Sequence, residues 1–102
     1  MAVLSNPANG STHHHGQAGS NTFTWINTSP VVANGTHWRL KIGTAPYGYN
    51  KFLGNPIPFA TLSDTAQKPA LTAKLYGTVE WSTNNGASWN NGGTYTWYNC
   101  AQ

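Results

Sequence analysis

Charged side chains are scarce in this sequence, and acidic ones are almost absent. Asp64 and Glu80 are the only carboxylate side chains, and charged residues make up 7 % of the 102 residues. Glycoside hydrolysis uses two carboxylates held roughly 5–10 Å apart. Glu80 falls on the polar side of an alternating pattern and Asp64 in a Ser-Asp-Thr turn, so we expect both in solvent. The sequence therefore offers no catalytic acid pair, and we expect a protein that is not an enzyme.

Clustered positive charge and long apolar runs are missing as well. Lys and Arg number five, which gives a net charge of +3, but they are spread singly along the chain. Nucleic-acid binders usually carry a dense stripe of these residues. No apolar run approaches the roughly 18 residues that a membrane span requires. We expect neither nucleic acid nor a membrane as partner.

Cysteine is limited to Cys100, so no disulfide can form within the chain. We expect this thiol to be inert, because no residue is placed to activate it as a nucleophile. The N-terminal residues have neither the basic nor the apolar segment of an export signal. Two origins fit this pattern: a complete chain made in a cytoplasm, or a piece of a longer secreted protein.

Helical periodicity is absent, and short blocks of period-two alternation take its place. Such alternation is typical of strands with one buried and one wet face. The apolar parity of these blocks predicts a core, and Gly77 within the longest block is expected to mark a bend or bulge. The strong blocks are residues 21–27, 36–42, 71–82 and 93–100, and the weaker ones are 2–4, 49–53 and 57–62. The expected core is Phe23, Trp25, Trp38, Leu40, Ile42, Leu71, Leu75, Val79 and Trp81.

Turn-forming residues separate the blocks. The Asn-Asn-Gly run at residues 84–86 favours a hairpin that leads from the third block to Trp89. About seven short strands at this spacing are typical of a two-sheet sandwich. We therefore predict one all-β domain over residues 1–102, an antiparallel two-sheet sandwich of the immunoglobulin-like or fibronectin type III-like class.

The order of motifs resembles that of fibronectin type III-like or Ig-like modules of bacteria and phages. Those modules open with a Pro-x-Asn-Gly-Ser turn and a Phe-Thr-Trp strand, followed by a strand ending in Ile-Gly-Thr-x-Pro. They close with Trp-Ser, a Gly turn, a Trp and a Tyr-Thr-Tyr strand. Here the corresponding residues are 7–11, 23–25, 38–46, 81–82, Gly86, Trp89 and 95–97. The resemblance implies the sandwich fold and says little about the ligand, because this fold hosts many functions.

A second, local resemblance covers residues 82–89, Ser-Thr-Asn-Asn-Gly-Ala-Ser-Trp. This run is similar to an Asp-box, with Asn84 in place of the Asp. The resemblance implies a polar side chain that folds back on the turn and a Trp that packs beneath the hairpin. The Asp-box is a structural device even in the sialidases that carry it, so one copy supports a hairpin and not glycosidase chemistry.

The sequence is rich in aromatic residues, with five Trp and five Tyr. Exposed rings bind sugars through their apolar faces and polar tips, whereas the alternative is packing over the ends or edges of the sandwich. The candidate binding residues are Tyr47, Tyr49, Phe52, Phe59, Trp89, Trp97 and Tyr98. We expect the contact face to combine residues 47–59 with the N-terminal arm.

The three consecutive histidines, His13, His14 and His15, are the only candidate metal ligands. In an extended segment two of them share a face, which falls short of the four ligands of a selective Zn²⁺ site. We expect no metal and no other cofactor.

Two functions fit these observations. The first is a non-catalytic structural protein on the surface of a larger assembly, a capsid-decoration or accessory protein of a phage virion, where several copies can act together. The sparse charge and the aromatic surplus support it, because interfaces are enriched in Tyr and Trp and depleted in charge. The second is a carbohydrate-binding or spacer module of a secreted enzyme or adhesin. The expected partner is accordingly a protein assembly such as a capsid surface, or a glycan, and the expected location is a virion surface or the extracellular space.

Overall fold

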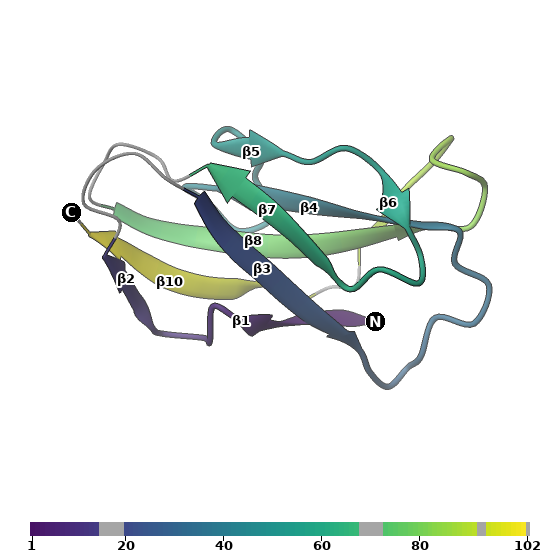
Figure 1. Cartoon of the computed structure of the whole chain (residues 1–102), viewed down its shortest axis with the longest axis horizontal. Helices are drawn as coiled ribbons and strands as arrows, with labels where there is room; N and C mark the ends of the chain where they lie inside the picture. The colour runs from purple at the N-terminus through teal and green to yellow at the C-terminus, as the bar shows by residue number, and fades with distance from the viewer. Residues whose placement is uncertain (15–19, 68–72, 92–93, 102) are drawn as a thin grey trace.

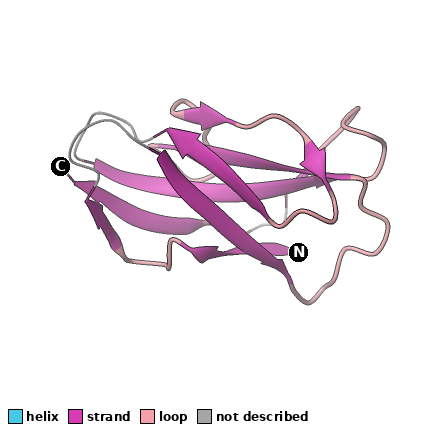
Figure 2. Ribbon diagram, in the orientation of Figure 1, coloured by secondary structure: helices cyan, strands magenta, loops and turns pink. Residues whose placement is uncertain are grey.

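The computed structural model describes residues 1–14, 20–67, 73–91 and 94–101, and shows only strands and loops there (Figures 1 and 2). Seven strands have three or more residues, and three further segments, β5, β6 and β9, have two. The bounds are β1 Ala2–Asn6, β2 Thr12–His14, β3 Ser20–Asn27, β4 His37–Gly43, β5 Phe52–Leu53, β6 Ile57–Pro58, β7 Ser63–Gln67, β8 Ala73–Ser82, β9 Asn90–Asn91 and β10 Thr96–Ala101.

The strands form two layers, with β3 and β7 crossing in front of β8 in Figure 1. The small sheet has the order β1-β3-β7. The large sheet has the order β2-β10-β8-β4-β5, with β6 on β4 and β9 on β8. Every described pairing is antiparallel except that of β2 with β10. The predicted all-β, two-sheet antiparallel sandwich is confirmed.

The core lies between the sheets and consists of the side chains on the apolar side of each strand. Trp25 of β3 meets Trp38 of β4 edge to face, with the ring centroids 6.4 Å apart. The Nε1 of Trp38 donates a hydrogen bond of 2.7 Å to the carbonyl oxygen of Phe59. Trp81 is only half-buried, and Leu71 lies outside the described residues. The other predicted core residues are buried: Phe23, Trp25, Trp38, Leu40, Ile42, Leu75 and Val79.

Gly77 does not form the expected bend or bulge. It continues the regular register of β8, opposite Ile42 on one side and Thr96 on the other. A Cβ at this position would lie 2.6 Å from Cδ1 of Leu4, which comes from β1 in the facing sheet. The two sheets therefore approach so closely at Gly77 that a side chain would not fit there without a shift of Leu4. The local sequence does not reveal this requirement, because Leu4 is distant along the chain.

Residues 63–65 were expected to form a turn, and this expectation was wrong. They belong to β7, which pairs with β3 so that Thr65 lies opposite Thr22. A run of polar residues carries no alternation signal, so only pairing with β3 makes it a strand. β7 lies at the edge of the small sheet.

Candidate functional site

The outer side of the large sheet, turned away from the core, carries most of the exposed rings and most of the charge. On β8 these outward positions alternate with the buried Leu75 and Val79. We call this surface the aromatic face. Its members are Arg39, Lys41, Tyr47, Tyr49, Lys74, Tyr76, Thr78, Glu80, Trp89, Tyr95 and Trp97.

A row of rings crosses the aromatic face from the loop after β4 to β10. The ring of Tyr95 meets that of Tyr47 at 5.5 Å and that of Tyr76 at 5.4 Å, both edge to face. The ammonium of Lys74 lies 5.4 Å from the ring centre of Tyr76 and 4.5 Å from that of Trp97. Tyr95 is 40 % exposed, so part of this row is open to a partner, and Tyr49, which lies beside Lys41 elsewhere on the face, is 60 % exposed.

The loop at residues 44–50 holds Tyr47 in place. Tyr47 has φ +63°, a left-handed conformation that costs an ordinary residue about 1 kcal/mol. Both polar atoms of the Asn50 amide bind Thr44, at the backbone N and at Oγ1, each at 3.0 Å. The backbone N of Gly48 donates to the carbonyl of Ala45 at 3.0 Å. These hydrogen bonds stabilise a strained backbone whose effect is to place a ring against Tyr95.

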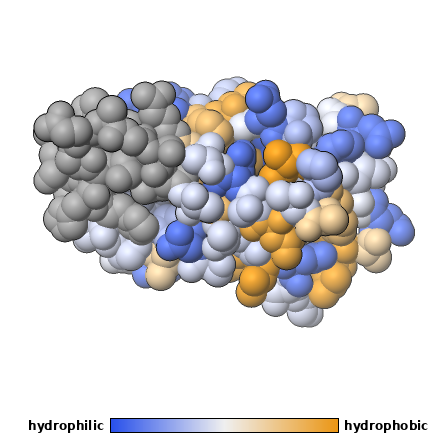
Figure 3. Space-filling view, viewed as in Figure 1, coloured by the Kyte–Doolittle hydropathy of each residue, from blue (hydrophilic) through white to orange (hydrophobic). Residues whose placement is uncertain are grey.

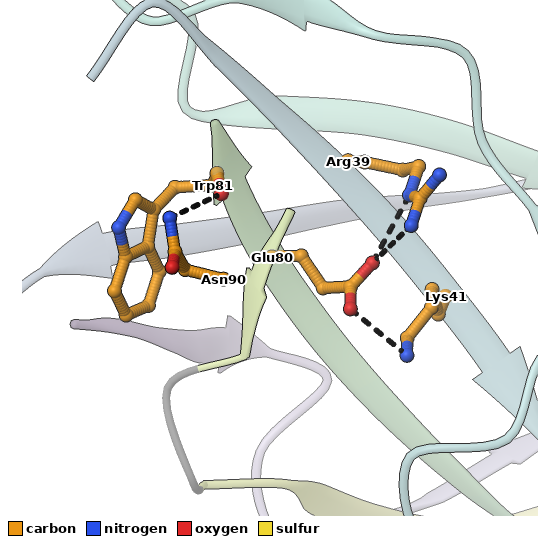
Figure 4. Close-up of polar contacts among 5 residues, drawn as sticks. All are labelled: Arg39, Lys41, Glu80, Trp81 and Asn90. Carbon is orange, nitrogen blue, oxygen red and sulfur yellow. Dashed lines mark hydrogen bonds and ion pairs between the residues drawn. The ribbon is translucent and has the colours of Figure 1, made fainter. Parts of the chain in front are cut away.

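Beside the ring row, Glu80 binds two cations (Figure 4). Its Oε1 accepts hydrogen bonds from Nε of Arg39 at 3.0 Å and from Nη2 at 2.6 Å. Its Oε2 lies 3.1 Å from Nζ of Lys41. The Glu80 side chain is 8 % exposed, so the expectation of a solvated carboxylate was wrong. Sequence alternation placed Glu80 outward, but the cations of β4 and the rings above them exclude water from that position.

The ring that covers Arg39 is Trp89, whose centre lies 4.4 Å from the guanidinium carbon. The turn before Trp89 is built by side chains. Oγ of Ser82 accepts hydrogen bonds from the backbone N of Asn84 at 3.2 Å and of Gly86 at 2.8 Å. Oδ1 of Asn84 accepts a bond of 3.0 Å from the backbone N of Ser88. The Asn84 side chain thus folds back on the turn, and Asn85 and Gly86 have φ +61° and +87°. The predicted hairpin is confirmed, because β9 pairs with β8.

The structure brings together four of the seven sequence candidates. Tyr47, Tyr49, Trp89 and Trp97 belong to the aromatic face. The Tyr98 side chain, by contrast, is 1 % exposed and lies in the core, so its assignment as a binding residue was wrong.

The other two candidates, Phe52 and Phe59, are half-buried and pack against the core. Phe59 stacks on Trp38 with the ring centres 4.5 Å apart. The N-terminal arm also contributes to the core, since Ala2 and Leu4 of β1 are buried. Parts of the expected contact face of residues 47–59 plus this arm therefore pack against the core, while other positions in both segments, such as Leu53 and Ser5, are exposed, and the contact face stays a prediction.

Seven of the eleven members of the aromatic face were not among the binding residues predicted from the sequence, and these include Lys74, Tyr76 and Tyr95. Tyr76 and Lys74 share the outward parity of β8, which was a usable signal. Tyr95 shares the parity of Trp97 in the alternating block at residues 93–100, so the same signal applied to it, although β10 begins only at Thr96. On β10 the small Thr96 and the large Tyr98 both turn inward, so ring size alone does not indicate the buried parity.

In the described ranges, no group of three or more His, Cys, Asp or Glu residues could hold a metal ion. His13 and His14 contribute backbone to β2, and His15 lies outside the described residues. A helix long and apolar enough to cross a bilayer does not occur in the part of the chain that the structure describes.

Comparisons of this chain with protein-family models, with curated proteins and with solved structures found no match. The features that indicate a function for this protein are therefore its two-sheet fold and the chemistry of the aromatic face.

Proposed function

We propose that this protein is a non-catalytic module that binds carbohydrate through the aromatic face while displayed on the surface of a larger assembly. The observation that carries the proposal is the row of rings formed by Tyr47, Tyr95 and Tyr76 on an outward sheet surface. Rings presented in this way stack on the apolar faces of pyranoses, and their hydroxyl groups reach sugar hydroxyls.

The absence of a suitable acid pair supports a binding role over a catalytic one. Asp64 lies on β7 of the small sheet, and both oxygens of Glu80 are bound to cations of β4. The order of motifs that resembles fibronectin type III-like modules, together with the Asp-box-like turn before Trp89, supports a display or spacer role. Low charge and many rings favour a crowded surface such as a phage virion as the setting, and a secreted enzyme or adhesin is the other setting.

The test is a glycan array followed by titration calorimetry on the full chain and two variants, Tyr95→Ala and Tyr76→Ala. Each lost ring contact is expected to weaken binding by about fivefold to tenfold, which corresponds to about 1 kcal/mol or slightly more. The matched control is Ile26→Ala, an exposed apolar position on the small sheet, which should leave affinity unchanged. Equal loss in all three variants, or no glycan bound at all, would refute the proposal.

A second candidate is capsid decoration through the opposite side of the sandwich. The outward positions of β1, β3 and β7 there form what we call the uncharged face: Val3, Ser5, Thr22, Thr24, Ile26, Ser63 and Thr65. Ile26 and the neighbouring-loop residue Val31 are 51 % and 64 % exposed. Figure 3 shows hydrophobic residues gathered over the end of β3 and the loop that follows it.

Attachment through the uncharged face should resist salt, because screening weakens only charge-driven contacts. The test mixes purified protein with undecorated virus particles at low salt and at about 1 M salt, where the Debye length falls to about 3 Å. Retention at both salt concentrations, lost in an Ile26→Ser, Val31→Ser double variant, supports decoration. Release at high salt, or retention by the double variant, contradicts it.

A further inference from the structure

Three rings of the aromatic face lie against cations, and one of them, Tyr49, is largely exposed. Lys74 lies over Trp97 at 4.5 Å, Arg39 over Trp89 at 4.4 Å and Lys41 near Tyr49 at 5.8 Å. A cation held against a ring loses part of its freedom before any ligand arrives. A neutral sugar that stacked on Trp97 would have to displace the Lys74 ammonium, whereas an anionic sugar can bind the ammonium where it already lies.

The charge on this face is also unbalanced. The face carries three cations, Arg39, Lys41 and Lys74, but only one carboxylate, Glu80, which leaves an excess of two positive charges on the face out of +3 for the whole chain. Glu80 is occupied by Arg39 and Lys41. The only other side-chain carboxylate, Asp64, is on the opposite sheet, where its Oδ1 accepts a hydrogen bond of 2.8 Å from the backbone N of Thr65. Lys74 is therefore a preorganised cation that neither side-chain carboxylate of the chain neutralises.

We infer that the ligand of the aromatic face is an acidic saccharide, whose carboxylate binds Lys74 while its pyranose rings stack on the row from Tyr76 to Tyr47. The inference rests on the proposed function and specifies the class of sugar. Tyr76 touches both Lys74 and Tyr95, so one ring separates the charge from the stacking surface. Nucleic acid fits less well, because its binding needs several cations that track the phosphates, and this face has one cation without a carboxylate.

The experiment uses titration calorimetry with the full chain and two matched ligand pairs: galacturonate oligomers with their methyl esters, and sialyllactose with lactose. The charged member of at least one pair should bind about tenfold more tightly, and added salt should reduce that difference. Lys74→Met should lower affinity for the charged member about fivefold and should not weaken binding of the neutral member. Lys74→Arg should restore most of the affinity. Lys51→Met is the control: it removes an exposed cation that lies two residues from Tyr49 but over no described ring, so it should lower affinity for the charged member much less than Lys74→Met does.

The outcomes separate the two proposals. Equal affinity for both members of both pairs overturns the acidic saccharide and leaves carbohydrate binding standing. No binding to any member, together with an empty glycan array, overturns both. Tighter binding of a single-stranded oligodeoxynucleotide than of either charged sugar overturns the inference in favour of nucleic acid.

Discussion

The two outer faces of this sandwich come from similar alternating strands, yet they differ in almost every physical property. The aromatic face holds three of the five cations of the chain and one of its two carboxylates. The uncharged face presents Ser and Thr with one apolar cross-strand pair, Val3 and Ile26. Two of its hydroxyl groups, Oγ of Ser5 and Oγ1 of Thr24, lie 3.0 Å apart.

The difference arises from what covers each sheet. Four rings lie over the large sheet: Tyr47 and Tyr49 from the loop after β4, Trp89 from the hairpin, and Tyr95. Thr78 and Glu80, which sequence alternation placed in solvent, are buried beneath this cover. On the uncharged face Thr22 and Thr65 stay exposed. A strand's polar side is thus wet only where no distant segment folds over it.

The largest expected effect compares the two carboxylates. Glu80→Gln leaves Arg39 and Lys41 without a counter-charge in a dry environment, which should lower the free energy of unfolding by about 3 kcal/mol. Asp64→Asn should change it by less than about 0.5 kcal/mol, because the amide oxygen can still accept the bond from Thr65. Urea unfolding at constant pH measures both. If both carboxylates were in solvent, as the sequence alone predicted, the two substitutions would have equally small effects.

A triple variant distinguishes the effect of the ion pairs from that of side-chain packing around position 80. It combines Arg39→Met, Lys41→Met and Glu80→Leu. Removing all the charges together avoids an unpaired buried ion, so most of the stability lost in Glu80→Gln should return. Equal destabilisation by Glu80→Gln and Asp64→Asn would show that Glu80 depends on its two cations no more than Asp64 depends on its hydrogen bond from Thr65.

The second-largest expected effect on stability concerns the rings that lie over the large sheet. Trp89→Ala removes the ring over Arg39 and should cost about 1–2 kcal/mol, from lost apolar contact and the lost cation–π interaction. Ile26→Ala on the uncharged face should cost less than about 0.5 kcal/mol, because that side chain is half-exposed. Thermal unfolding of both variants checks the contrast. A larger loss for Ile26→Ala would mean that the uncharged face is the more tightly packed of the two.

The smallest effect isolates the strain at Tyr47. Tyr47→Ala and Tyr47→Gly remove the same ring, but only Gly adopts φ +63° without penalty. The Gly variant should therefore be more stable than the Ala variant by about 1 kcal/mol, or roughly 4 °C or more in Tm. The difference in Tm between these two variants is the measurement. No difference would indicate that the loop relaxes out of the left-handed conformation once the ring is gone.

Part of the candidate site could be predicted from the sequence. Tyr47, Tyr49, Trp89 and Trp97 were chosen because they fell outside the clear core parity, and all four belong to the aromatic face. Tyr98 was chosen for the same reason and proved to be core. Adjacent residues on a strand point to opposite sides, so at most one of Trp97 and Tyr98 could belong to the outer face. Which one it was depended on the register of β10 against β8, where Tyr98 lies opposite the buried Leu75.

By itself the sequence determined the strand blocks, the hairpin at residues 84–86 and the core around Trp25 and Trp38, because period-two spacing and turn residues act within a few positions. Only the tertiary structure decided that residues 63–67 form a strand, that Gly77 makes room for Leu4, and that Glu80 is buried between two cations. It also decided that Tyr47, Tyr76 and Tyr95 meet. Each of these outcomes depends on a partner distant along the chain, and local alternation carries no information about which distant segment will lie against a given face.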